Sequence, residues 1–202
     1  MVLELKEVDV KAHMLARSAF PVYSLGTWRK RGDRNFTPLG TYLHELKYEA
    51  LSERQVEEGV SRLVDLMLPE MKRIWPDYPA DFSISVPPNL PRSRDLPARL
   101  ARHIGLRTRI KRNTEILHLT RRIPSMKNTP RKERPVVLDR AYSAQLPSTL
   151  KRGLLVVDDV YDSGSTVRAV RQAFLRAGIQ SEMNFFVIAH ISQPNSKWEV
   201  VT

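Results

Sequence analysis

The sequence predicts an α/β fold with a largely parallel central sheet flanked by helices. Two apolar runs, at 154–157 and 184–191, are uninterrupted, which is typical of parallel strands buried on both faces. Between them, apolar residues recur at helical spacing from Val167 to Ala177, and Gly178 follows as the expected end of the helix. Strand, helix and strand in this order indicate a parallel arrangement.

The N-terminal quarter adds a strand and two helices to this pattern. Residues 20–28 are a weakly predicted strand. Residues 37–50 are predicted to form a short helix, because Thr37 can cap its start and Pro38 suits the first helical position. The stronger helix covers 53–75, where apolar residues three and four positions apart form one stripe.

Predicted strands and helices also alternate in the middle of the chain. Residues 81–87 are predicted to be a strand that ends at a Pro-Pro pair, and residues 94–105 a helix with Gly105 as its C-cap. Beyond them, we expect strands at 115–119 and 135–142, joined by a long mobile loop. That loop covers 120–134, where apolar residues show no period.

Composition narrows the protein class. The 202 residues include no cysteine, which excludes disulfides, thiolate zinc sites and a cysteine nucleophile and fits a reducing compartment. The first ten residues contain three acids and no apolar core of a signal peptide, and no run approaches 18 apolar residues. We therefore expect a cytoplasmic protein with no membrane segment.

The net charge of +11 is concentrated in one segment. Residues 91–140 hold 15 Lys and Arg against 4 Asp and Glu, whereas the remainder of the chain holds 18 of each. Such a segment suits an anionic partner, either a phosphorylated small molecule or nucleic acid. A solvated, flexible charged loop is the alternative interpretation.

The stretch "LLVVDDVYDSGST" (154–166) contains the clearest site pattern. Asp158 and Asp159 follow an apolar strand, and the carboxyl ends of parallel strands are where open sheets bind ligands. Gly164 permits close approach of a ligand to the backbone, and free N–H groups at a helix start bind phosphate. Because carboxylates accept hydrogen bonds from sugar hydroxyls, the stretch fits a ribose 5-phosphate. A capped structural turn with solvated acids is the alternative.

The same stretch resembles the ribose-phosphate motif of type I phosphoribosyltransferases: an apolar strand, two acids, an apolar residue and a loop that ends Gly-x-Thr. The resemblance implies that phosphoribosyl pyrophosphate (PRPP) binds there. It also implies a type I phosphoribosyltransferase-like fold with a small N-terminal subdomain and a flexible hood. The implied PRPP-binding residues are Asp158, Asp159, Asp162, Ser163, Gly164, Ser165 and Thr166.

More of the chain, roughly 20–191, is similar to the competence protein F (ComF) branch of this class. "LHELKY" (43–48) resembles its Leu-Lys-Tyr segment, and "MKNTPRKERPVVLDRAY" (126–142) loosely resembles its arginine-rich hood. Two features depart from that branch: the N-terminal cysteine zinc module is absent, and the loop begins Asp-Ser-Gly instead of Thr-Thr-Gly. Purine phosphoribosyltransferases carry an aspartate at the position of Asp162, where it accepts a proton from the base.

This resemblance gives the remaining residues their expected roles. Asp162, Asp158 and Asp159 are the catalytic candidates, and Mg²⁺ is the expected cofactor, with no direct protein ligand or with Asp158 and Asp159 bound to it through water. The pyrophosphate loop is expected to follow the strand that ends at Val86 and to use Pro87, Pro88, Asn89, Arg92 and Arg94. The hood is expected to contribute Arg131, Lys132 and Arg134. For each arginine, the alternative is an ordinary solvent-exposed side chain. For Lys47, the alternative is simple packing of its side chain at a helix end.

The sequence thus predicts a phosphoribosyltransferase that binds PRPP or a nucleoside monophosphate and transfers 5-phosphoribosyl to a nitrogenous base. The competing hypothesis is a non-catalytic sensor of PRPP or nucleotides that binds nucleic acid through residues 91–140. In either case we expect residues 1–50 to form an N-terminal hood subdomain and residues 51–202 the main α/β domain. The acceptor base stays open, as does the choice between a monomer and a homodimer.

Overall fold

The structure is a computed structural model, which describes residues 13–16, 20–30, 32, 34–78, 80–88, 94–126, 128–192 and 199–200. The elements run in the order β1 (His13–Ala16), β2 (Val22–Lys30), α1 (Pro38–Tyr48), α2 (Glu53–Ile74), β3 (Phe82–Ser85), α3 (Leu96–Arg107), β4 (Lys111–Arg112), β5 (Leu117–Leu119), α4 (Arg134–Val137), β6 (Tyr142–Ala144), β7 (Gly153–Tyr161), α5 (Ser165–Arg176), β8 (Glu182–Ser192) and β9 (Glu199–Val200). None of the helices in these described ranges combines the length and apolarity needed to cross a bilayer.

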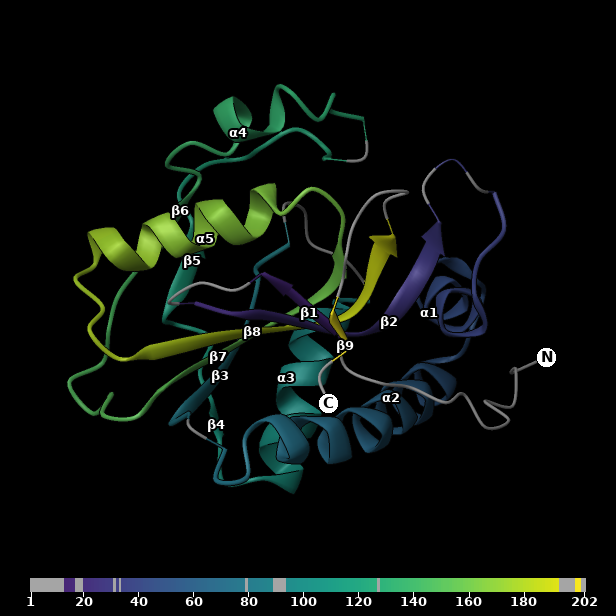
Figure 1. Cartoon of the computed structure of the whole chain (residues 1–202), viewed down its shortest axis with the longest axis horizontal. Coiled ribbons are helices and arrows are strands. Elements are labelled where there is room, and N and C mark those ends of the chain that lie inside the picture. Colours follow the sequence, from purple (N-terminus) through teal and green to yellow (C-terminus); the bar gives the residue numbers. More distant parts are fainter. Residues whose placement is uncertain are drawn as a thin grey trace.

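A seven-stranded sheet in the order β4-β3-β7-β8-β2-β1-β9 forms the centre of the molecule (Figure 1). The neighbours from β4 to β2 are parallel, while β1 pairs antiparallel with β2 and with β9. The prediction of a mixed α/β fold with a largely parallel sheet is confirmed. A separate antiparallel pair, β5 and β6, lies outside this sheet.

Helices cover both faces of the sheet and enclose one apolar core on each side. Leu155 and Val157 of β7 point into the core beneath α1, α2 and α3, whereas Leu154 and Val156 point into the core beneath α5 and the β5–β6 pair. This alternation is what a strand buried on both faces requires. Figure 1 shows α5 above the sheet and α2 and α3 below it.

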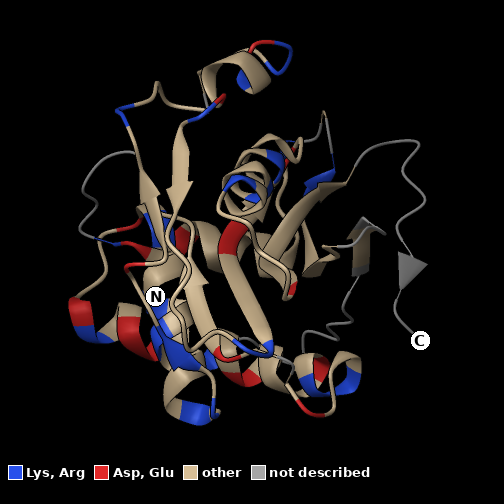
Figure 2. Cartoon of the chain, turned by 90° about the vertical axis from the view of Figure 1, so that its left-hand side faces the viewer, with Lys and Arg blue, Asp and Glu red and all other residues tan. Residues whose placement is uncertain are grey.

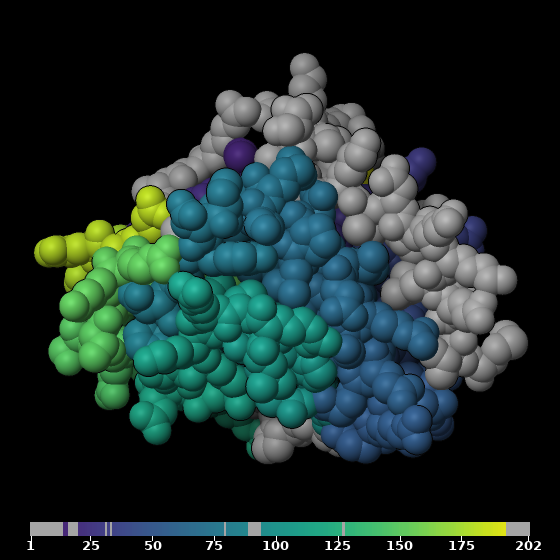
Figure 3. Space-filling model, turned by 90° about the horizontal axis from the view of Figure 1, so that it is seen from below, coloured from purple at the N-terminus to yellow at the C-terminus, as the bar shows by residue number. Residues whose placement is uncertain are grey.

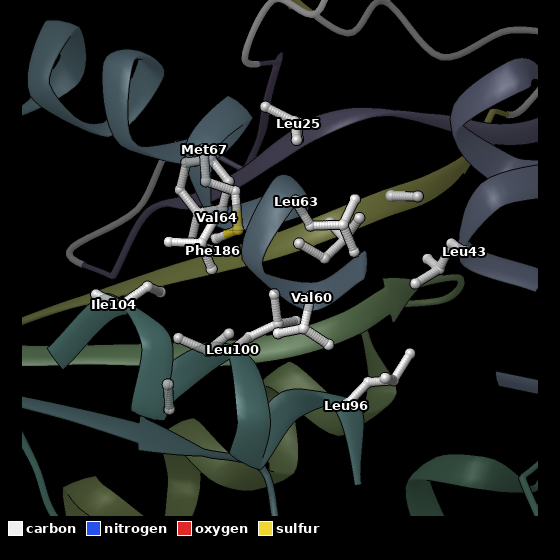
Figure 4. Packing of buried hydrophobic residues seen from close by; sticks show 14 of the residues in the cluster. Leu25, Leu43, Val60, Leu63, Val64, Met67, Leu96, Leu100, Ile104 and Phe186 are labelled. Carbon is white, nitrogen blue, oxygen red and sulfur yellow. The ribbon is translucent and has the colours of Figure 1, made fainter. Parts of the chain in front are cut away.

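The core beneath α2 and α3 is drawn in Figure 4. Val60 and Leu63 of α2, Leu100 of α3 and Phe186 of β8 meet there, and none of these side chains is exposed. From outside, the same two helices lie side by side on this face of the molecule (Figure 3). The apolar stripe predicted for 53–75 is therefore core.

Side-chain caps fix where the first three helices begin. The Thr37 hydroxyl accepts a hydrogen bond from the N–H of Gly40 at 3.0 Å and starts α1, as predicted. Ser52 and Gln55 form a capping box at the start of α2, and the Asp95 carboxylate accepts from the N–H of Ala98 at 3.2 Å at the start of α3.

Two sequence-based assignments are wrong. Gly105 does not cap α3 but lies inside it, where a Cβ atom would come within 3.2 Å of the Ile110 carbonyl oxygen. Its lack of a side chain therefore serves close packing of the helix. Residues 135–142 do not form a strand: α4 occupies Arg134–Val137, and β6 begins only at Tyr142. Val136, an apolar residue of the expected strand, is 76% exposed and is not part of a buried strand.

The expected N-terminal segment, residues 1–50, contributes directly to the central sheet and core. β2 pairs in parallel with β8, and α1 places Leu43 and Leu46 in the same core as α2 and α3. Before Arg134, the expected loop 120–134 contains no helix or strand within its described residues.

Candidate functional site

The chain reverses its direction of winding between β3 and β7. These strands are parallel neighbours, and the Val86 N–H donates to the Val157 carbonyl at 3.0 Å. From β3 the chain passes through α3 on one face to β4, whereas from β7 it passes through α5 on the other face to β8. Ligands of open α/β sheets bind at the carboxyl ends of the strands at such a switch point. The predicted ribose-phosphate loop follows β7 at this position.

The loop turns tightly at Gly164, which caps α5 in a left-handed conformation with φ of 70°. A Cβ atom at this position would lie 2.6 Å from the Tyr161 hydroxyl, so the turn requires glycine for two independent reasons. The Ser163 and Ser165 hydroxyls lie 2.9 Å apart and form a hydrogen bond. The first N–H groups of an α-helix have no partner within the helix, which makes the start of α5 suitable for an anion.

Arg168, one turn into α5, contacts this loop, although the sequence motif did not include it. Its guanidinium donates to the Ser163 carbonyl and to the Ser165 hydroxyl, both at 3.1 Å. The cation therefore adds positive charge beside the N–H groups at the helix start. Its spacing from Gly164, four residues, is the only signal in the sequence that points to this contact.

The paired acids lie within β7 and not after it. The strand continues to Tyr161, and Asp158 pairs with Val187 of β8 in its register. Because neighbouring strand residues point to opposite faces, the two carboxylates separate. Asp158 is on the side of Tyr142, whose pKa is raised by burial and by the negative charge of Asp158.

Asp159 points to the other face and meets Lys47 of α1. The Lys47 ammonium donates to the Asp159 carboxylate at 2.6 Å, and the two side chains are only 11% and 13% exposed. The same ammonium lies 5.1 Å from the centre of the Trp28 ring and 5.7 Å from that of Tyr48. Lys47 is therefore part of the site, and its place in the "LHELKY" segment was the signal for it.

Asp162 holds two of the three hood residues that the sequence predicts. Arg131 donates to one oxygen of its carboxylate, and Arg134 donates to the other at 2.6 Å. Arg134 also donates to the Thr129 carbonyl at 3.0 Å, which links the start of α4 to the segment that precedes it. Lys132, in contrast, is exposed and has no ion-pair partner among the described residues.

The expected pyrophosphate residues are only partly brought together. Pro87 and Pro88 follow Val86, whose N–H donates to the Val157 carbonyl of β7. Asn89 and Arg92 lie outside the described residues. Arg94 is committed elsewhere. Its guanidinium donates to three backbone carbonyls around the end of α1, those of Leu46, Glu49 and Leu51.

Carboxylate oxygens are the donors that Mg²⁺ accepts, so Asp158 and Asp159 fit the expected ion chemically. Lys47 already neutralises part of the charge on Asp159. Most ligands of a bound ion would therefore have to come from the substrate and from water. Within the described part of the chain, no three His, Cys, Asp or Glu side chains gather in a way that would hold a metal ion.

Comparison with known proteins adds no family assignment. No protein-family model matches the chain, and no curated protein matches it.

Proposed function

We propose that the protein binds PRPP or a nucleoside monophosphate and transfers the 5-phosphoribosyl group to a nitrogenous base, with release of pyrophosphate. The observation that carries this proposal is the position of the 158–166 stretch. Its two acids lie within the last four residues of β7 and its glycine turn follows the strand, at the switch point of the sheet.

The loop and the acids bind different parts of the ligand. The N–H groups at the start of α5 and the Thr166 hydroxyl bind the 5-phosphate, and Arg168 supports them with its charge. Asp159 accepts a hydrogen bond from a ribose hydroxyl, whereas Asp158 points to the opposite face of β7 and accepts from the N–H of Asp159 at 2.8 Å. Lys47 contacts only Oδ2 of Asp159, so Oδ1 keeps its capacity to accept a bond from the sugar.

The reaction breaks the bond between the anomeric carbon and the pyrophosphate oxygen and forms a bond from that carbon to a nitrogen of the base. Positive charge develops on the ribose, and the carboxylates of Asp158 and Asp159 stabilise it. Mg²⁺, when bound, neutralises the pyrophosphate. Asp162 accepts the proton that the base loses, which requires that one of its oxygens leave Arg131 or Arg134.

Calorimetry with PRPP and Mg²⁺ tests the binding step. Gly164→Ala is expected to abolish binding, because the loop cannot keep its φ of 70° beside Tyr161. Gly178→Ala is the matched control: Gly178 has a φ of 76°, but no atom lies within 4 Å of an added Cβ. Both variants carry the strain of about 1–2 kcal/mol of a left-handed residue, so only the first should lose PRPP.

A second pair of variants tests the contribution of the Thr166 hydroxyl. Thr166→Val keeps the shape of the side chain but removes its hydroxyl, and we expect PRPP to bind at least about fivefold more weakly. Thr149→Val makes the same change at an exposed position of another loop and should have no effect. Undiminished PRPP binding in Gly164→Ala and Thr166→Val would overturn the assignment of the site.

The alternative, a nucleic-acid-binding regulator, is favoured by a different observation. Seven exposed basic residues between 94 and 140 have no acidic partner within the described ranges: Arg109, Lys111, Arg112, Arg121, Arg122, Lys132 and Arg140. Unpaired cations on a surface attract polyanions. Both activities fit one chain, because these residues are distinct from the loop at 158–166.

A further inference from the structure

The ammonium group of Lys47 is held in one position by three other side chains. It donates to the Asp159 carboxylate at 2.6 Å and lies 5.1 Å from the centre of the Trp28 ring and 5.7 Å from that of Tyr48. Cations are attracted to the faces of aromatic rings, so both rings favour this position. Because Lys47 and Asp159 are only 11% and 13% exposed, water screens their charges little.

This ammonium group has more hydrogen-bonding capacity than Asp159 uses. An ammonium has three N–H donors and no acceptor. Among the residues that the structure describes, Lys47 donates through its side chain only to Asp159. Its other N–H groups are therefore left for oxygen atoms of a ligand that Asp159 binds.

Basic side chains outnumber the carboxylates of the stretch 158–166. The stretch contains three aspartates, and four basic side chains of the described residues contact it: Lys47, Arg131, Arg134 and Arg168. Together these groups carry one net positive charge, to which the N–H groups at the start of α5 add. A phosphate monoester carries close to two negative charges at neutral pH. Groups of the protein itself therefore balance much of the charge of such a ligand.

A divalent cation beside Asp159 would neutralise the carboxylate and bind the ribose hydroxyls that approach it. The Lys47 ammonium already occupies a position 2.6 Å from Oδ2 of Asp159. Two cations on one carboxylate repel each other strongly where little water reaches them. Mg²⁺ also gives up its own waters reluctantly. Lys47 and a metal ion are thus alternatives at this carboxylate.

We infer that Lys47 is the built-in counter-ion of the ribose subsite and takes the place of a divalent cation there. This inference rests on the proposed function and deepens it. The site binds sugar monophosphates such as ribose 5-phosphate without Mg²⁺, and only the pyrophosphate of PRPP requires the ion. The Lys47 ammonium donates to Asp159 and to a ribose hydroxyl, so it both contacts the ligand and keeps the carboxylate in position.

Calorimetric titration of ribose 5-phosphate into the full chain, in EDTA and in Mg²⁺, tests the inference. For the wild type, we expect the two dissociation constants to agree within about twofold. Lys47→Met keeps an unbranched side chain but removes the ammonium. In EDTA it should bind ribose 5-phosphate at least about tenfold more weakly, because Asp159 is left without its counter-ion. Mg²⁺ should restore part of this loss, since the ion can then approach the carboxylate.

Two further variants serve as controls. Lys72→Met makes the same change at an exposed position of α2 and should leave both dissociation constants unchanged. The double variant Lys47→Met with Asp159→Asn removes both charges, so it leaves no unpaired buried carboxylate that would destabilise the fold. Because this variant has no charge at 159 for a metal ion to neutralise, Mg²⁺ should not raise its affinity for ribose 5-phosphate.

Three results would overturn the role of Lys47 and leave the proposed function standing. The first is that EDTA weakens binding of ribose 5-phosphate to the wild type by more than about twofold. The second is that Lys47→Met binds it in EDTA as tightly as the wild type does. The third is that Mg²⁺ raises the affinity of the double variant as much as that of Lys47→Met. If the wild type binds neither ribose 5-phosphate nor PRPP, with or without Mg²⁺, the proposed function itself fails.

Discussion

Asp162 is the residue on which the charge balance of the candidate site depends. Its two oxygens accept from Arg131 and Arg134, and all three side chains are between 14% and 27% exposed. The carboxylate therefore holds the turn that carries these arginines against the loop. Its role as a proton acceptor and its role as an anchor make different predictions.

We expect Asp162→Asn to lower kcat for phosphoribosyl transfer while the dissociation constant of PRPP stays nearly the same. The amide keeps the shape of the side chain but has almost no basicity. Loss of a general base typically lowers the rate on the order of 10² to 10⁴-fold. Steady-state kinetics and calorimetry measure the two quantities separately.

Arg134→Ala is the matched variant, because it breaks one contact to Asp162 but leaves the carboxylate in place. It should retain far more turnover than Asp162→Asn. Equal losses of turnover in the two variants would show that Asp162 acts by anchoring the arginines. The proton-acceptor role would then be wrong.

Among the elements, those that bury a continuous apolar pattern were predicted from the sequence. This holds for α2, α5, β7 and β8, whose residues face the two cores. The two-residue strand β4, Lys111–Arg112, has two exposed basic side chains and no pattern to recognise. It forms only because its backbone pairs with β3.

The candidate site, like the fold, was predicted from the sequence only in part. Its acids and its glycine turn are local features and were read from one stretch. The partners of those acids were not, since Lys47 lies 112 positions before Asp159 and meets it only in the folded chain. Arg94 shows the opposite error: its position after the Pro-Pro pair suggested phosphate, but the carbonyls at the end of α1 bind it.

Glu57 of α2 contacts three basic side chains of α3, Arg99, Arg102 and His103. Burial opposes its ionisation, but hydrogen bonds from His103 and Arg99 and the charges of Arg102 and Arg99 outweigh burial and lower its pKa below the ordinary 4.5. A lowered pKa means that the ionised form stabilises the fold. This contribution is complete above the unfolded-state pKa and is lost as the pH falls through the lower folded-state pKa.

We therefore expect Glu57→Gln to lower the free energy of unfolding by about 1 kcal/mol at pH 7, with the difference from wild type shrinking as the pH falls below about 4. Urea denaturation at a series of pH values measures this difference. Glu58→Gln is the control: among the described residues Glu58 pairs only with Arg54 of its own helix, and these side chains are 52% and 88% exposed. It should cost at most about 0.5 kcal/mol. Equal effects at the two positions would contradict the assigned role of Glu57.

At the scale of the whole molecule, the folded chain offsets much of its uneven charge. Acidic side chains of α2 face basic ones of α3, as Glu57 does with Arg99 and Arg102, and Asp65 does with Arg107. Figure 2 shows this mixture of Lys and Arg with Asp and Glu on the helices at the bottom of the view. Fewer cations of residues 91–140 are thus available to a polyanion than the sequence count suggests.

The cations that remain predict weak nucleic-acid binding without sequence preference. Each phosphate that they neutralise releases a counterion, so affinity must fall with salt. With about four contacts to a single strand, log K should fall against log salt with a slope near about −3. Electrophoretic shift of a single-stranded oligonucleotide at several salt concentrations measures this slope.

Lys111 and Arg112 are adjacent, exposed and without an acidic partner among the residues that the structure describes, which makes them the sharpest test. Replacing both by Gln should reduce the size of the slope by roughly 1.4, since each contact to a single strand contributes about 0.7. Lys72→Gln with Lys151→Gln removes the same charge from exposed positions outside 91–140 and should leave the slope unchanged. If both double variants reduce the slope equally, net charge alone explains the binding. PRPP with Mg²⁺ should not compete, because the loop at 158–166 is separate from these two cations. Competition by PRPP would place both ligands on the same arginines.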